Sequence, residues 1–139
     1  MTLKHFAVTA LVSLSATVAC ADPLQDPLAR TPQGRVQLCE KQMKRYKTAL
    51  EMYSTDHQGL YPNSLQELSD SYLMRTPSDY LLGRIPTCPA ARKDTYSFSY
   101  KPSADHKKFV LFCKGNWHKE AGLARDFPRW DFAKGMQER

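Results

Sequence analysis

Cysteines are the residues of this 139-residue sequence with the widest choice of chemistry, and there are four of them. Cys88 and Cys113 flank a segment that we expect to form a β-hairpin. We predict a disulfide between them, which would close a loop of about 25 residues and stabilise the fold by roughly 3 kcal/mol. Because neither lies in a Cys-x-x-Cys motif, the sequence favours a structural bridge over a redox or catalytic pair. For Cys39 we expect a small buried thiol, and the alternative is pairing with Cys20 or with a cysteine of another chain.

Metal binding is the next chemistry to test on the cysteines and histidines. Cys113 and His118 are the nearest pair, whereas His57 and His106 lie far away in the sequence. Zinc sites are usually marked by Cys-x2-Cys or His-x3-His spacing, which is absent here, and an oxidised Cys113 could not act as a ligand. The sequence therefore predicts no metal site and no cofactor.

Motifs for catalysis are equally scarce. The sequence contains no Gly-x-Ser-x-Gly nucleophile elbow and no glycine-rich phosphate-binding loop. We therefore predict no catalytic residues and expect that the protein is not an enzyme.

The first 21 residues have the pattern of a signal peptide. Lys4 supplies a basic start, and the apolar run Phe6–Val18 is too short to span a bilayer as a stable helix. Ala19 and Ala21 are the small residues that favour cleavage after Ala21. The alternative is lipidation of Cys20, as in bacterial lipoproteins. Both alternatives predict a periplasmic or extracellular protein, with or without a lipid anchor to the envelope, where disulfides persist.

Composition limits the remaining classes. The length suits one domain, and 42% hydrophobic with 24% charged residues is ordinary for a globular chain. The formal net charge of +6 would suit an acidic partner such as an envelope surface. Aromatic residues at Tyr96, Phe98 and Tyr100 could stack on bases, but a place in the core is the favoured interpretation, so we expect no nucleic acid partner.

Residues 22–34 contain three prolines and a glycine and are interpreted as a linker ahead of a domain at 35–139. An apolar stripe with helical spacing then begins, which predicts one long helix ending near residues 55–59. The stripe consists of Val36, Cys39, Met43, Tyr46, Leu50 and Tyr53. Off the stripe lies a basic face that is either simply solvated or a docking face for an acidic surface: Lys41, Lys44, Arg45 and Lys47.

Shorter elements follow the predicted helix. Ser64–Glu67 matches a capping box and starts a short second helix. Alternation over residues 95–100 predicts a half-buried strand, and the apolar run Phe109–Cys113 predicts a second strand covered on both faces. The two should pair as an antiparallel hairpin, with loops and room for a short third strand after Lys114.

Several segments together carry a family resemblance. Residues 39–61, followed by Tyr-Pro-Asn-Ser-Leu-Gln-Glu-Leu at 61–68, resemble the head domain of type II secretion and type IV pilus pseudopilins. Residues 85–90, 94–97 and 112–116 are similar to a pilin-like subgroup with a paired cysteine. The resemblance implies an α+β fold in which a long N-terminal helix packs on a small antiparallel sheet with one disulfide.

The prepilin N-terminal motif is missing: the sequence has no Gly-Phe cleavage site, no Glu shortly after it and no apolar half-helix. We therefore do not expect assembly by the usual route of that family. The expected function is an exported, non-catalytic structural or binding module whose partners are proteins of a secretion or pilus assembly. The alternatives are a freestanding envelope lipoprotein or ligand-binding domain and, less favoured, an exported enzyme.

Overall fold

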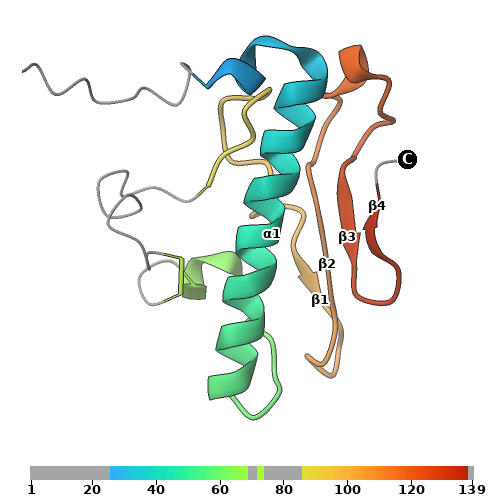
Figure 1. Ribbon diagram of the computed structural model, residues 1–139. Helices are drawn as coiled ribbons and strands as arrows, with labels where there is room; N and C mark the ends of the chain where they lie inside the picture. Colours follow the sequence, from blue (N-terminus) through green and yellow to red (C-terminus); the bar gives the residue numbers. More distant parts are fainter. Residues whose placement is uncertain (1–25, 69–71, 74–85, 138–139) are drawn as a thin grey trace, which may run out of the picture.

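A computed structural model describes residues 26–68, 72–73 and 86–137 of the chain. Helix α1 (Pro32–Asp56) lies along a four-stranded antiparallel sheet in the order β1-β2-β3-β4 (Figure 1). The strands are β1 (Lys101–Pro102), β2 (Phe109–Phe112), β3 (Arg129–Asp131) and β4 (Gly135–Gln137), and the short 3-10 helices are η2 (Pro27–Arg30), η3 (Leu65–Leu68) and η4 (Lys119–Ala121). The predicted α+β class, with one long helix and an antiparallel sheet, is confirmed.

The start of α1 lies inside the segment that we expected to be a linker. Thr31 caps the helix by accepting the Gly34 N–H at 3.0 Å, and Pro32 takes the first helical position, where its missing N–H is not needed. Gly34 allows η2 to pack against this first turn, because a Cβ there would lie 1.9 Å from the carbonyl oxygen of Leu28. The folded domain therefore begins before residue 35.

The apolar stripe of α1 forms the core as predicted. Its side chains at Cys39, Met43, Tyr46 and Leu50 are fully buried, and Tyr53 is half-buried at the end of the stripe. The helix ends at Asp56, close to the predicted stop, and Gly59 follows with a φ of +85° that suits glycine. This stripe faces the sheet, so its fully buried side chains lie in the centre of the domain.

The predicted capping box at residues 64–67 forms only in part. The Glu67 carboxylate accepts the backbone N–H groups of Asn63 and Ser64, each at 3.1 Å, as a capping box requires. The Ser64 hydroxyl instead donates to the same carboxylate at 3.4 Å. The element that follows is the short η3, and its Leu65 and Leu68 are fully buried against the core.

The prediction of a strand over residues 95–100 is wrong, because this segment forms a turn. The Asp94 carboxylate accepts the N–H groups of Tyr96 and Ser97 at 2.8 and 3.0 Å, and the Tyr96 carbonyl accepts those of Ser99 and Tyr100, each at 2.9 Å. The turn directs Tyr96 and Tyr100 into the core, as expected, but leaves Phe98 75% exposed. The hairpin partner of β2 is consequently only the two-residue β1 that follows the turn.

Strand β2 orients the sheet relative to α1. Phe109 and Leu111 are buried on the face toward the helix, where Leu111 pairs with Trp130 of β3. Val110 and Phe112 are only half-buried, so the strand is covered on one face and not on both as we expected. Because buried and half-buried side chains alternate along β2, the next residue, Cys113, points inward, and it is 1% exposed.

Among the residues that the structure describes, no helix combines the length and the apolar character needed to cross a membrane.

Candidate metal centre

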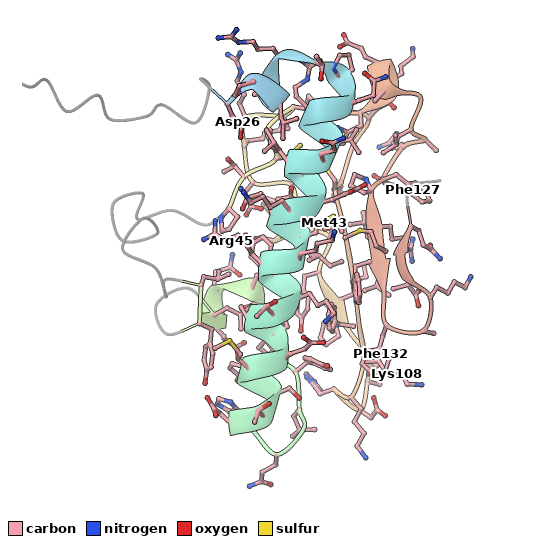
Figure 2. The ribbon with its side chains drawn as sticks, viewed as in Figure 1. Asp26, Met43, Arg45, Lys108, Phe127 and Phe132 are labelled. Carbon is pink, nitrogen blue, oxygen red and sulfur yellow. The ribbon has the colours of Figure 1, made fainter. Side chains whose placement is uncertain are left out.

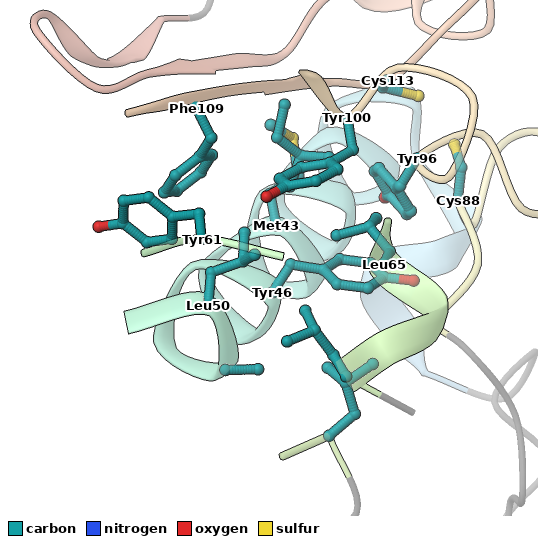
Figure 3. Packing of buried hydrophobic residues seen from close by; sticks show 14 of the residues in the cluster. Met43, Tyr46, Leu50, Tyr61, Leu65, Cys88, Tyr96, Tyr100, Phe109 and Cys113 are labelled. Atoms are coloured by element: carbon teal, nitrogen blue, oxygen red, sulfur yellow. The ribbon is translucent and has the colours of Figure 1, made fainter. Parts of the chain in front are cut away.

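Four buried side chains with reactive or ligating atoms meet at one end of the core. They are Cys39, Cys88, Cys113 and His118, with exposed fractions of 0%, 0%, 1% and 3%. Their sulfur atoms and one ring nitrogen all lie within 4.8 Å of one another. Figure 3 shows the sulfurs of Cys88 and Cys113 beside the ring of Tyr96. The cluster therefore joins α1, the loop before the sheet, the end of β2 and the loop that leads to η4.

Cys39 belongs to the cluster because it lies on the buried stripe of α1. Its sulfur is 3.0 Å from the hydroxyl of Tyr96, whose ring is itself fully buried and packs on Tyr46 with centroids 5.4 Å apart. We expected a small buried thiol at this position. The burial is confirmed, but the thiol is not isolated.

Cys88 is presented by a tight loop over residues 88–93. The Cys88 N–H donates to the Lys93 carbonyl at 3.0 Å, and the Arg92 N–H donates to the Cys88 carbonyl at 2.8 Å. Arg92 takes a left-handed conformation with a φ of +54°, which lets the chain reverse within so few residues. Just before the loop, the Tyr46 hydroxyl donates to the Pro86 carbonyl at 3.2 Å and ties this segment to α1.

Cys113 and His118 are held by a second tight loop. The Cys113 N–H donates to the Pro128 carbonyl at 3.0 Å, so the end of β2 stays in line with the next strand. Gly115 has a φ of +125°, and its N–H and carbonyl both pair with Asp126, through the carboxylate and the backbone N–H, at 2.8 Å each. This anchoring brings the chain back so that His118 faces the sulfur of Cys113.

The imidazole of His118 lies between two of the sulfurs. Its Nε2 is 3.5 Å from the Cys88 sulfur and 3.7 Å from the Cys113 sulfur. Its Nδ1 is buried and has no hydrogen-bond partner among the described residues. Among the described residues, the polar contacts of this ring are therefore made through Nε2, on the side of the cysteines.

The three thiols lie close enough to one another to shift each other's pKa values in different directions. The pKa of Cys88 is held well below its ordinary value, chiefly because the Cys113 thiol, then the Cys39 thiol, and finally His118 stabilise its thiolate. The pKa of Cys39 is raised, first by its hydrogen bonds with Cys113 and Cys88 and then by burial. The cluster is thus a place where thiolate charge is favoured at one sulfur and resisted at another.

The predicted disulfide between Cys88 and Cys113 is not formed, so that prediction is wrong for this structure. Cys39, Cys88 and Cys113 are all free. The sulfurs of Cys88 and Cys113 are both turned toward His118 Nε2 instead of forming a bond with each other. The Cys39 sulfur lies in the same cluster. Cys20, the candidate lipidation site, lies outside the described residues.

The proposed docking residues do not all share one surface. Lys41 and Lys44 are exposed, and Figure 2 shows Arg45 on the side of α1 turned away from the sheet. Lys47 instead lies on the flank beside the sheet, where it pairs with Glu51 at 2.6 Å and sits 5.2 Å above the ring of Trp130. The outward basic face is therefore smaller than the sequence implied.

Three sulfurs and an imidazole nitrogen together form a donor set that suits a tetrahedral thiophilic metal ion. Burial leaves these groups no access to a substrate in solution, so the arrangement suits holding chain segments together better than reacting with a ligand. No protein-family model, no curated protein and no solved structure matches this chain.

Proposed function

We propose that this protein is an exported, non-catalytic module, similar in build to the head of a pseudopilin, that serves a secretion or pilus assembly as a structural or binding component. The observation that carries the proposal is the packing of the 25-residue α1 on a small antiparallel sheet. This is the arrangement implied by the resemblance of residues 39–68 to pseudopilin heads.

The beginning of α1 supports a free head over a fibre subunit. Pseudopilin fibres are built from an apolar half-helix that continues directly into the head helix. Here Thr31 caps α1, Pro32 opens it and η2 folds back against Gly34. A helix with such a start does not continue toward its N-terminus, so the head would meet its partners through its own surface.

A non-catalytic role is supported by where the reactive groups lie. The three thiols and His118 are at most 3% exposed, which keeps them from a substrate in solution. Two other histidines bond to backbone carbonyls: His57 to Tyr53 at 2.8 Å and His106 to Tyr61 at 2.9 Å. These contacts are typical of side chains that stabilise turns.

Export is tested by intact-mass analysis of the full chain recovered from envelope and cytoplasmic fractions. We expect an envelope protein that either lacks residues 1–21 or carries lipid on Cys20. An unprocessed protein confined to the cytoplasm would contradict the proposal.

Partner binding is tested by charge reversal on the exposed face of α1. We compare the double variant Lys41→Glu/Lys44→Glu with the control Lys107→Glu/Lys108→Glu, which changes net charge equally at exposed positions after the hairpin turn. Co-purification with envelope partners after cross-linking should fall at least roughly tenfold for the first variant and persist for the second. Equal behaviour of the two variants would refute a docking role for α1.

A further inference from the structure

We propose that Cys39, Cys88, Cys113 and His118 bind one zinc ion, which joins the long helix to the sheet. The four donors come from three separate segments, namely α1, the loop over residues 88–93 and the loop from Cys113 to His118, and have their ligating atoms within 4.8 Å of one another. This site goes beyond the role proposed above and does not depend on it. It also differs from our expectation, from spacing alone, that the chain holds no metal.

The geometry of the donors is close to that of a zinc tetrahedron. Zinc–sulfur bonds of about 2.3 Å and a zinc–nitrogen bond of about 2.0 Å give edges of roughly 3.6 Å between sulfur and nitrogen and roughly 3.8 Å between sulfurs. The measured distances from His118 Nε2 to the sulfurs of Cys88 and Cys113 are 3.5 and 3.7 Å. Even the widest separation in the cluster needs to shrink by only about 1 Å to fit those edges.

Two of the sulfurs also have a hydroxyl group from outside the cluster within hydrogen-bond distance, and once the sulfurs are metal-bound thiolates these hydroxyls would be the donors. The Tyr96 hydroxyl lies 3.0 Å from the Cys39 sulfur, and the Thr95 hydroxyl lies 3.3 Å from the Cys113 sulfur. Such outer hydrogen bonds orient metal ligands and stabilise thiolates.

These donors matter because the filled site would carry charge. Three thiolates, a neutral imidazole and Zn²⁺ leave one net negative charge in the core. Hydrogen bonds from the Tyr96 and Thr95 hydroxyls to the sulfurs of Cys39 and Cys113 would spread part of that charge over neighbouring dipoles, which lowers the cost of burying it.

Zinc is the metal that this site fits best. Hard ions such as Ca²⁺ and Mg²⁺ require oxygen ligands, whereas thiolates and imidazole in a tetrahedral array select zinc. The cluster is buried and provides four protein ligands, which leaves no open position for a water or substrate. The zinc would therefore be structural.

Zinc binding and a disulfide within the cluster exclude each other. Oxidising two of the three thiols would leave only one sulfur and His118 as ligands. The state of the full chain as purified from cells therefore decides between them: one bound zinc with three reduced cysteines supports the site, whereas a disulfide and no zinc would overturn it.

The direct test is a zinc titration of the reduced, metal-free full chain in competition with a chromophoric chelator. We expect one zinc per chain, and Co²⁺ in its place should give the intense visible bands of tetrahedral thiolate coordination. Failure of the reduced protein to bind zinc, or a weak octahedral cobalt spectrum, would overturn the proposal.

Matched variants separate ligation from packing. His118→Gln should weaken zinc binding by more than roughly 100-fold, whereas the same substitution at exposed His57 should leave it unchanged. His118→Cys should restore binding, because four cysteines also form a structural zinc set. Wild-type affinity in His118→Gln, or a failure of His118→Cys to bind in a protein that circular dichroism shows to be folded, would count against the site.

Discussion

The loop from Cys113 to His118 should be unusually sensitive to substitution at Gly115. Its φ of +125° lies beyond the left-handed region that other residues occupy, and alanine there costs roughly 1–3 kcal/mol in backbone strain. The added Cβ would also lie 2.3 Å from Nε1 of Trp117. The indole would have to move and give up its hydrogen bond to the Lys114 carbonyl, now 2.9 Å long, at a cost of about 1 kcal/mol.

The expected loss of stability for Gly115→Ala is therefore about 2–4 kcal/mol. Gly59→Ala is the matched control, because Gly59 also has a positive φ, +85°, but a Cβ there would meet nothing within 4 Å. The loss of stability in Gly59→Ala should come only from the left-handed backbone conformation, at about 1 kcal/mol. Both variants place alanine at a positive φ, but only Gly115→Ala adds the clash with Trp117 and the greater strain of a φ of +125°.

The assay is thermal and urea denaturation of the metal-free protein followed by circular dichroism. At roughly 4 °C per kcal/mol, Gly115→Ala should lower Tm by about 8–16 °C and Gly59→Ala by about 4 °C. Using metal-free protein isolates the strain of the loop from any effect on metal binding. Equal shifts for the two variants would refute the claim that the tight packing around Gly115 holds this loop.

Three further outcomes are expected. Tyr96→Phe should weaken zinc binding by roughly 10- to 100-fold, because it removes the hydroxyl beside Cys39. The control Tyr100→Phe loses a hydroxyl that donates to the Pro62 carbonyl and should leave zinc binding unchanged. Equal zinc affinities of the two variants would argue against a role for the outer hydrogen bonds. Leu111→Ala should lower the free energy of unfolding, measured in urea, by about 2–5 kcal/mol, because Leu111 faces α1. Val110→Ala should lower it clearly less, because Val110 lies on the other face of β2 and is only half-buried. The reverse order would indicate a different strand register. Glu120→Gln should change the free energy of unfolding by less than about 1 kcal/mol. Glu120 forms a 2.8 Å ion pair with Arg35, but its side chain is 74% exposed, so the pair is weakened by solvent. A larger loss would show that η4 depends on this ion pair.

The helix and its buried face were predictable from the sequence because both are local properties. The spacing of Cys39, Met43, Tyr46 and Leu50 repeats with the helical period, and no other period accommodates these residues on one face. The stop near Gly59 follows from the conformational freedom of glycine. A helix of this length also had to be the main packing surface in so small a domain.

The misassigned strand shows where local periodicity is ambiguous. Tyr96 and Tyr100 are four residues apart, which fits the alternation of a strand but also fits a turn. In the structure a turn buries both side chains. The deciding residue is Asp94, whose carboxylate accepts two backbone N–H groups and reverses the chain. An aspartate just before an alternating run is therefore a sequence signal for a turn.

The cluster itself could be predicted only in part. The helical stripe placed Cys39 inside, and continuing the alternation of β2 from Leu111 would also have placed Cys113 inside, which brings two of the four donors toward one core. Cys88 and His118 sit on loops whose positions depend on contacts with Lys93 and Asp126. Such loop contacts leave no periodic trace in the sequence, and short-motif rules do not detect ligands spread over three segments.

The most direct test of a zinc-joined core is X-ray absorption spectroscopy at the zinc edge of the purified full chain. We predict a first shell of three sulfurs at about 2.3 Å and one nitrogen at about 2.0 Å. This shell should change to four sulfurs in His118→Cys and stay the same in His57→Gln. A shell dominated by oxygen, or fewer than three sulfurs in the wild-type protein, would contradict the binding of zinc by Cys39, Cys88, Cys113 and His118.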